Sequence, residues 1–63
     1  MVLTYTTDKE YKIGIISALL AENAIEFNII NKQDSMYKFG DIELYVDEIN
    51  FKKAREIIDE VKI

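Results

Sequence analysis

The sequence Asp41-Ile42-Glu43-Leu44-Tyr45-Val46-Asp47 alternates apolar with polar side chains and ends in a second aspartate. A period of two is typical of a strand that has one face in the core. We therefore predict a strand over residues 41–46, with the isoleucine, leucine and valine inward and with Glu43 and Tyr45 outward. Because aspartate accepts hydrogen bonds from the free amides at a helix start, Asp47 is predicted to cap a helix that runs to about residue 62.

The segment after Asp47 has the period of an amphipathic helix. At about 100° per residue its apolar side chains fall within one arc of about 120°, and charged side chains fill the rest. This helix is expected to lie on the sheet through that arc, which consists of Phe51, Ala54, Ile57, Ile58 and Val61.

Two more strands are predicted on the N-terminal side. Residues 2–6 are rich in β-branched and aromatic side chains, which are typical of strands. Residues 25–30 alternate between apolar and polar faces and predict a half-buried strand, which a polar loop over residues 32–40 follows.

A helix is predicted between these two strands. Thr7 and Glu10 have the spacing of a capping box, in which each side chain accepts from the other residue's amide. The helix is expected to run from Thr7 to about Glu22. Asn23 tolerates the left-handed conformation and is the expected terminator.

This first helix has two apolar sides. One side can face the sheet and consists of Ile13, Ile16, Leu20 and Ala24. The other side has the spacing i, i+4, i+8 and consists of Tyr11, Ile15 and Leu19. Since a helix that is apolar nearly all round is buried nearly all round, the second side is expected to contact either another protomer or the second helix.

The elements follow the order β-α-β-β-α in a single domain over residues 1–63. A β-α-β crossover is right-handed, and the last two strands are expected to be antiparallel neighbours. If the third strand inserts beside the first, the strand order is 2-3-1 and both helices cover one face of a three-stranded sheet. This α+β arrangement is a ferredoxin-like plait that lacks its fourth strand.

The small size of the chain predicts self-association. Its 63 residues include no cysteine or histidine, so neither a disulfide nor a cysteine-histidine metal site stabilises the fold. The uncharged strand over residues 2–6 has a free edge that invites pairing. It remains open whether Val2 and Thr4 or Leu3 and Tyr5 face the core. We expect a homo-oligomer, a dimer or trimer, whose candidate interface residues are Thr4, Tyr11, Ile15, Leu19, Ile30 and Tyr45.

Catalysis, cofactors and metal binding are not expected. The absence of histidine and cysteine excludes nucleophile-histidine arrangements. Glycine occurs only at positions 14 and 40, so no phosphate-binding glycine motif can be written. Asp34 lacks the surroundings of a calcium loop. Ser17 lies within a helix and is expected to bond the preceding turn rather than to act as a nucleophile.

The charge balance argues against nucleic acid as a partner. Twelve acidic and eight basic residues give a net charge of −4. The cations over residues 52–55 share their helix with acidic side chains, whereas phosphate binding needs a basic cluster. The longest apolar run, residues 13–21, is too short to span a membrane, and no signal peptide is visible. We expect a cytoplasmic protein that contacts no membrane and binds a protein partner of unknown identity.

The loop over residues 32–40 carries three large apolar side chains, Met36, Tyr37 and Phe39. One interpretation is that they fold back as a lid over the open end of the core. The other is that they form a contact surface for a partner, since loops lie at the surface and often carry function. Substitution by serine distinguishes the two, because only the lid contributes to stability.

Several stretches spread over essentially the whole chain are shared with a known family of small domains. They are Tyr5-Thr6-Thr7, residues 19–25, Phe27, Asn31, Ile42-Glu43-Leu44-Tyr45-Val46 and Ala54-Arg55-Glu56-Ile57-Ile58. Through them the sequence resembles the small prokaryotic signal transducing protein domain, a family of unknown function with a ferredoxin-like, PII-like plait. That family often has glycine where this chain has Ala24, so Asn23 is expected to take the turn role. The resemblance implies a regulatory role and carries over no catalytic residue.

The function expected from the sequence is that of a non-catalytic regulatory or protein-interaction domain. The alternative is a sensor that binds an anionic metabolite between protomers. For that alternative, positive charge would come from Lys32, Lys38 or the helix start near Thr7.

Overall fold

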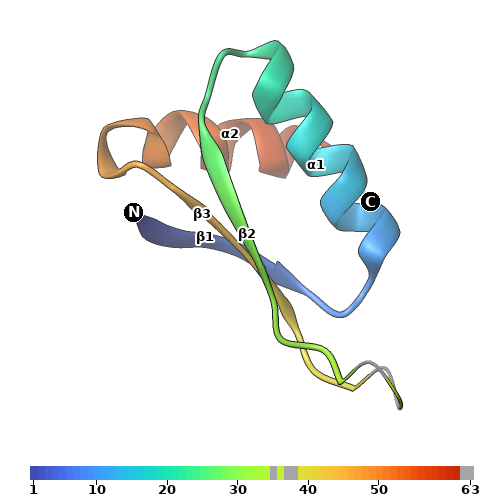
Figure 1. Cartoon of the computed structure of the whole chain (residues 1–63). Helices are drawn as coiled ribbons and strands as arrows, with labels where there is room; N and C mark the ends of the chain where they lie inside the picture. Colours follow the sequence, from blue (N-terminus) through green and yellow to red (C-terminus); the bar gives the residue numbers. More distant parts are fainter. Residues whose placement is uncertain (35, 37–38, 62–63) are drawn as a thin grey trace.

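The computed structural model describes residues 1–34, 36 and 39–61 of the chain (Figure 1). Its elements are β1 (Val2–Thr7), α1 (Glu10–Glu22), β2 (Phe27–Asn31), β3 (Ile42–Val46), a 3-10 turn (Glu48–Asn50) and α2 (Phe51–Glu60).

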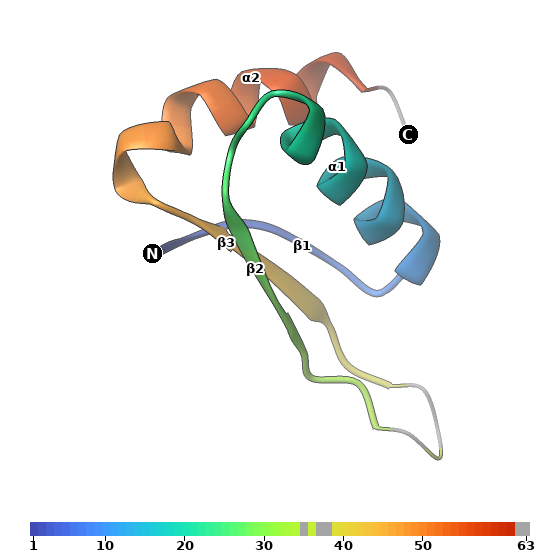
Figure 2. The same ribbon diagram turned by 45° about the horizontal axis from the view of Figure 1, so that its top comes forward.

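β3 is the central strand of a three-stranded sheet. The strands lie in the order β1-β3-β2, and β3 is antiparallel to both of its neighbours. Read from the β2 edge, this order is 2-3-1. Both helices lie on the same side of the sheet (Figures 1 and 2). The predicted α+β class is thus confirmed, with one layer of helices and one layer of strands.

The core lies between β3 and the two helices. The alternation predicted for β3 is confirmed, because its three apolar side chains are buried while Glu43 and Tyr45 are half-buried on the other face. Tyr5, Phe27 and Ile57 pack against the edge of this core. The enclosed apolar side chains are Ile13, Ile16, Leu20, Ile25, Ile42, Leu44, Val46, Ala54 and Ile58.

The predicted cap at Asp47 is confirmed. Its carboxylate accepts a hydrogen bond from the Ile49 amide at 3.4 Å. The first turn is a 3-10 turn, and the α-helix proper is α2, which ends at Glu60. Ala54 and Ile58 are the members of the predicted apolar arc that α2 buries in the core.

The capping box predicted at the start of the first helix is wrong. Thr7 belongs to β1 and pairs with Ile42, so α1 begins three residues later, at Glu10. The Thr7 hydroxyl accepts instead from the Lys9 amide at 3.2 Å, and Lys9 takes the cap position without a side-chain bond. Strand pairing at Thr7 therefore overrides the local capping signal.

The end of α1 also differs from its prediction. Ala24, not Asn23, has the left-handed conformation, with φ of 57°. The Ile25 amide donates to the Leu20 carbonyl at 2.9 Å, and the Ala24 amide donates to the Ala21 carbonyl at 3.1 Å. These two bonds form a Schellman motif.

Closing this motif moves the start of the next strand. Ile25 is buried at the helix end, so β2 begins at Phe27 rather than at residue 25. Ala24 is exposed and adds nothing to the buried stripe of α1. The Asn23 side chain donates to the Leu19 carbonyl at 2.8 Å, which also accepts from the Asn23 backbone amide at 3.2 Å.

The left-handed alanine predicts a stabilising substitution. Ala24→Gly is expected to raise the free energy of unfolding by about 0.5–1 kcal/mol, because relief of the steric cost of a left-handed Cβ outweighs the added entropy of the unfolded chain. Urea unfolding followed by circular dichroism measures the change. Ala21→Gly, at an exposed helical position in the same turn, is the control and should lower stability by about 0.5–1 kcal/mol. Equal losses for the two variants would contradict the prediction.

A β-bulge in β1 decides which of its side chains face the core. Leu3 pairs with Tyr45 and Tyr5 pairs with Leu44, so Thr4 is an extra residue. Thr4 is 5% exposed and Tyr5 packs against the core, so two successive side chains face inward. Neither strict alternation considered for this strand is therefore correct. The bulge leaves Leu3 on the outer face.

Candidate interaction surfaces

Neither helix covers the outer face of the sheet (Figure 2). This face carries apolar side chains. Leu3 is 46% exposed and Ile30 is 40% exposed on this face, and Tyr45 lies between the edge strands on β3. The strand register arranges six side chains in two cross-strand rows. These rows are Leu3, Tyr45 and Asn28, and Thr6, Glu43 and Ile30.

A polar network crosses the centre of this outer face. The Tyr45 hydroxyl donates to Glu43 Oε1 at 2.8 Å, and Lys32 Nζ lies 3.2 Å from the same oxygen. The Tyr45 hydrogen bond and the Lys32 ammonium hold the pKa of Glu43 below its ordinary value. Because the Tyr45 hydroxyl donates its proton in a hydrogen bond to the Glu43 carboxylate, loss of that proton is disfavoured. The pKa of Tyr45 therefore lies above its ordinary value.

The two pKa shifts predict a pH-dependent contribution of Tyr45 to stability. Because the Glu43 pKa is lower in the folded chain, the stabilisation is complete above about pH 4.5 and declines as the pH falls through the folded pKa. Because the Tyr45 pKa is higher in the folded chain, the stabilisation is complete below about pH 10 and declines as the pH rises through the folded pKa.

We therefore expect Tyr45→Phe to lower the free energy of unfolding by a constant amount between about pH 5 and 9. Outside this range, the difference in unfolding free energy between wild type and the variant should become smaller. Urea titrations across the pH range measure the difference. When Glu43→Gln is also present, the effect of Tyr45→Phe on the free energy of unfolding should no longer become smaller below about pH 5. If it still does, a group other than Glu43 causes the change.

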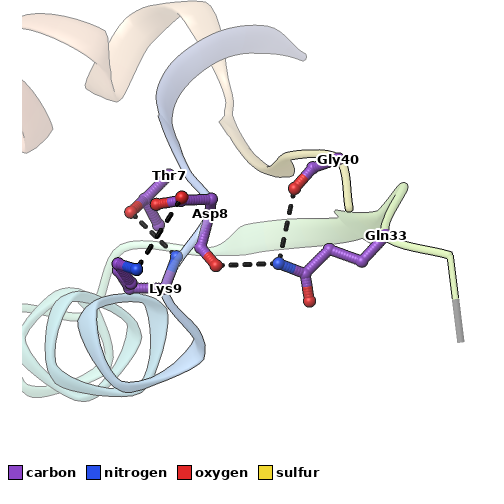
Figure 3. A network of polar contacts seen from close by, with 5 residues as sticks. All are labelled: Thr7, Asp8, Lys9, Gln33 and Gly40. Atoms are coloured by element: carbon purple, nitrogen blue, oxygen red, sulfur yellow. Dashed lines mark hydrogen bonds and ion pairs between the residues drawn. The ribbon is translucent and has the colours of Figure 1, made fainter. Parts of the chain in front are cut away.

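The base of the β2–β3 hairpin is tied to the turn between β1 and α1 (Figure 3). The Gln33 side-chain amide donates to the Asp8 carbonyl at 2.7 Å and to the Gly40 carbonyl at 3.3 Å. Gly40 has φ of 108°, and a Cβ at this position would lie 2.6 Å from the Lys32 carbonyl oxygen. Only glycine fits at position 40, because the chain there passes directly against the Lys32 backbone on the other side of the hairpin.

Two of the three apolar side chains predicted for the hairpin loop are solvent-exposed. Met36 is 80% exposed and Phe39 is 75% exposed, and the hairpin extends away from the helices (Figures 1 and 2). The lid interpretation is therefore wrong for these two residues. Tyr37 lies outside the described residues.

The second apolar side of α1 is only partly covered. Tyr11 is 62% exposed, Ile15 is 39% exposed and Leu19 is half-buried, although α1 and α2 are in contact. These three side chains belong to the helical layer, whereas Ile30 and Tyr45 lie on the opposite face. The predicted interface residues thus fall on two separate surfaces, and the buried Thr4 side chain lies on neither.

A further feature, which the sequence analysis did not identify, lies along β1. An open hollow of about 380 Å³ is lined by Leu3, Thr4, Tyr5, Thr6 and Arg55. A second hollow, of about 440 Å³, is lined by Val2, Leu3, Glu48, Phe51 and Lys52. Both hollows border Leu3 of β1, and α2 contributes to the lining of each. The two hollows together are called the groove. The sequence marks this place only by Arg55, the single arginine of the chain. The contact between its helix and β1 is seen only in the structure.

The cations proposed for an anionic ligand have acidic neighbours. Lys32 is paired with Glu43. Near Thr7, Asp8 lies 3.9 Å from Lys9, and Glu10 occupies the first turn of α1. Lys38 lies outside the described residues.

Ser17 has the predicted structural role, because its hydroxyl donates to the Gly14 carbonyl at 3.1 Å. Among residues 1–34, 36 and 39–61, no group of three or more acidic side chains could hold a metal ion. None of the helices in this part of the chain is long and apolar enough to cross a membrane.

Comparison with known proteins gave no match: no family model, no curated protein and no solved structure is significantly similar to this chain.

Proposed function

We propose that this chain is a non-catalytic protein-interaction domain that self-associates through the outer face of its sheet. The observation that carries the proposal is the group of Leu3, Ile30 and Tyr45 on a face that neither helix covers. Burial of a side chain such as isoleucine contributes about 1.5–3 kcal/mol. A two-fold contact buries each of these side chains twice.

The size of the chain determines how much of this face a dimer must use. A stable interface buries about 800 Å² per partner, which is close to a fifth of the 4463 Å² surface of this chain. Three side chains do not supply that area. The proposed contact therefore extends over both cross-strand rows and includes the polar network of Glu43, Tyr45 and Lys32.

A regulatory role forms part of the same proposal and rests on the resemblance to the signal transducing protein domain. The strand order and the placement of both helices on one face support a ferredoxin-like plait without its fourth strand. Such a plait leaves the outer face of its sheet free for contact.

The proposal predicts that Ile30→Thr weakens self-association. The substitution keeps a β-branched side chain on β2 but removes apolar area, and each copy is expected to lose about 1 kcal/mol. Since a two-fold dimer loses this amount twice, the dissociation constant should rise roughly 30-fold. Sedimentation equilibrium measures it.

Ile49→Thr is the matched control, because Ile49 is 86% exposed in the 3-10 turn and lies outside the sheet. It should leave the dissociation constant unchanged. A wild-type chain that stays monomeric at millimolar concentration would refute self-association, and equal weakening by both variants would refute the assignment to the outer face.

The exposed hairpin residues are proposed as a contact site for a different protein. Because Met36 and Phe39 are mostly exposed, the double variant Met36→Ser/Phe39→Ser should keep its free energy of unfolding within about 0.5 kcal/mol of wild type. Chemical denaturation tests this expectation. A protein that co-purifies with wild type from native cells should be lost from the double variant. A large fall in stability would instead assign these residues to the fold.

The sensor of an anionic metabolite is the weaker alternative. Glu43 neutralises Lys32, and Asp8 and Glu10 place negative charge at the start of α1. Thermal-shift screening against nucleotides and anionic metabolites distinguishes the two functions, because a ligand that binds the folded chain raises its melting temperature with dose.

A further inference from the structure

β1 is an edge strand with a groove beside it. One side of β1 pairs with β3, and the other side faces the groove that α2 borders. On this side the groove is lined by Glu48 of the 3-10 turn and by Phe51, Lys52 and Arg55 of α2. The spacing of the three α2 residues places them on one helical face. From its first to its last residue, Val2–Thr7 offers about 17 Å of edge. An open strand edge of this length is a site for the addition of another strand.

Two carbonyls of β1 are already occupied by side chains of the same chain. The Thr4 hydroxyl donates to the Val2 carbonyl at 3.1 Å. Arg55 Nη1 donates to the Thr4 carbonyl at 3.0 Å, across 51 positions of sequence. The bulge makes the second bond possible, because it takes Thr4 out of the regular pairing with β3.

Arg55 is held over the strand edge from its other side. Its Nη2 atom lies 3.2 Å from Asp59 Oδ1, one helical turn further along α2. The guanidinium thus bridges the helix to the strand and occupies the position that an incoming strand's amide would need. Bulges and cations at sheet edges are the means by which folded chains prevent unwanted pairing.

We infer that Arg55 closes the β1 edge against β1 of a second copy of this chain. Val2–Thr7 contains no charged residue, so two copies of the strand would not repel each other by their own side chains. Leu3 and Phe51, 46% and 38% exposed, would be covered by the pairing. In an antiparallel pair centred near Thr4, the two copies of Arg55 would meet beside the symmetry axis. The pairing would have to displace both guanidinium groups from Thr4 and Asp59, whereas the addition of a single unrelated segment would displace one.

This inference concerns the hydrogen-bonding edge of β1, and the proposed function concerns the outer face of the sheet. Leu3 borders both surfaces, so hydrogen exchange of the β1 amides, which only edge pairing hydrogen-bonds, separates the two proposals. It implies that the wild-type chain leaves its β1 edge unpaired. Removal of the guanidinium frees the Thr4 carbonyl and clears the space over the strand edge.

The test compares Arg55→Ala with Arg55→Lys and Lys53→Ala. Arg55→Ala should lower the dissociation constant for self-association at least about tenfold relative to wild type. Hydrogen exchange read by mass spectrometry should show new protection of β1 amides in the associated species. Arg55→Lys keeps a cation over the edge and should behave as wild type. Lys53→Ala removes an exposed cation that does not line the groove, and it should also behave as wild type.

A folded Arg55→Ala variant without stronger association, or with association that leaves β1 amides unprotected, would overturn the inference. Lys53→Ala matching Arg55→Ala would also overturn it, because net charge would then be the cause. If Arg55→Ala does not fold, the wild-type chain supplies the test. Its β1 amide protection should not rise with protein concentration, and a rise would show that Arg55 leaves the edge open.

Discussion

The pairing of β3 on both of its sides is the constraint on which the rest of the structure depends. Ile42, Leu44 and Val46 can be buried on one face only because β1 and β2 flank the strand that carries them. Both helices pack on that face, which leaves the other face of the sheet without a covering layer (Figure 2). The apolar outer face and the exposed hairpin residues are therefore consequences of a sheet with one helical layer.

Elements with a strong hydrophobic period could be predicted from the sequence, and elements set by long-range pairing could not. The alternation in β3 and the Asp47 cap depend only on residues that are close together in the sequence, so the sequence pattern predicts both. The predicted capping box failed because Thr7 pairs with Ile42, thirty-five positions away. No local pattern marks Thr4 as a bulge, since the bulge exists only relative to β3. Of the predicted interface residues, Ile30 and Tyr45 share a face, but the contribution of Leu3 required the register.

The two edges of the sheet are treated differently. At β1, the Thr4 hydroxyl and Arg55 occupy the carbonyls of Val2 and Thr4. β2 has neither charge nor bulge in Phe27–Asn31, and its Ile29 and Ile30 are both about 40% exposed. Under the two proposals, contact between copies uses the outer face of the sheet while β1 stays closed. A small chain can thus associate in a closed form and avoid open-ended strand addition.

The Gln33 side chain couples the base of the hairpin to the turn before α1. Because one amide nitrogen bonds the carbonyls of both Asp8 and Gly40, the hairpin cannot swing about its base without breaking its link to the residues just before α1 (Figure 3). Gly40 also packs directly against the Lys32 backbone, where no larger residue fits. Gln33 thus joins three separate stretches of the chain, namely the end of β2, the approach to β3 and the turn before α1, through a single side-chain amide.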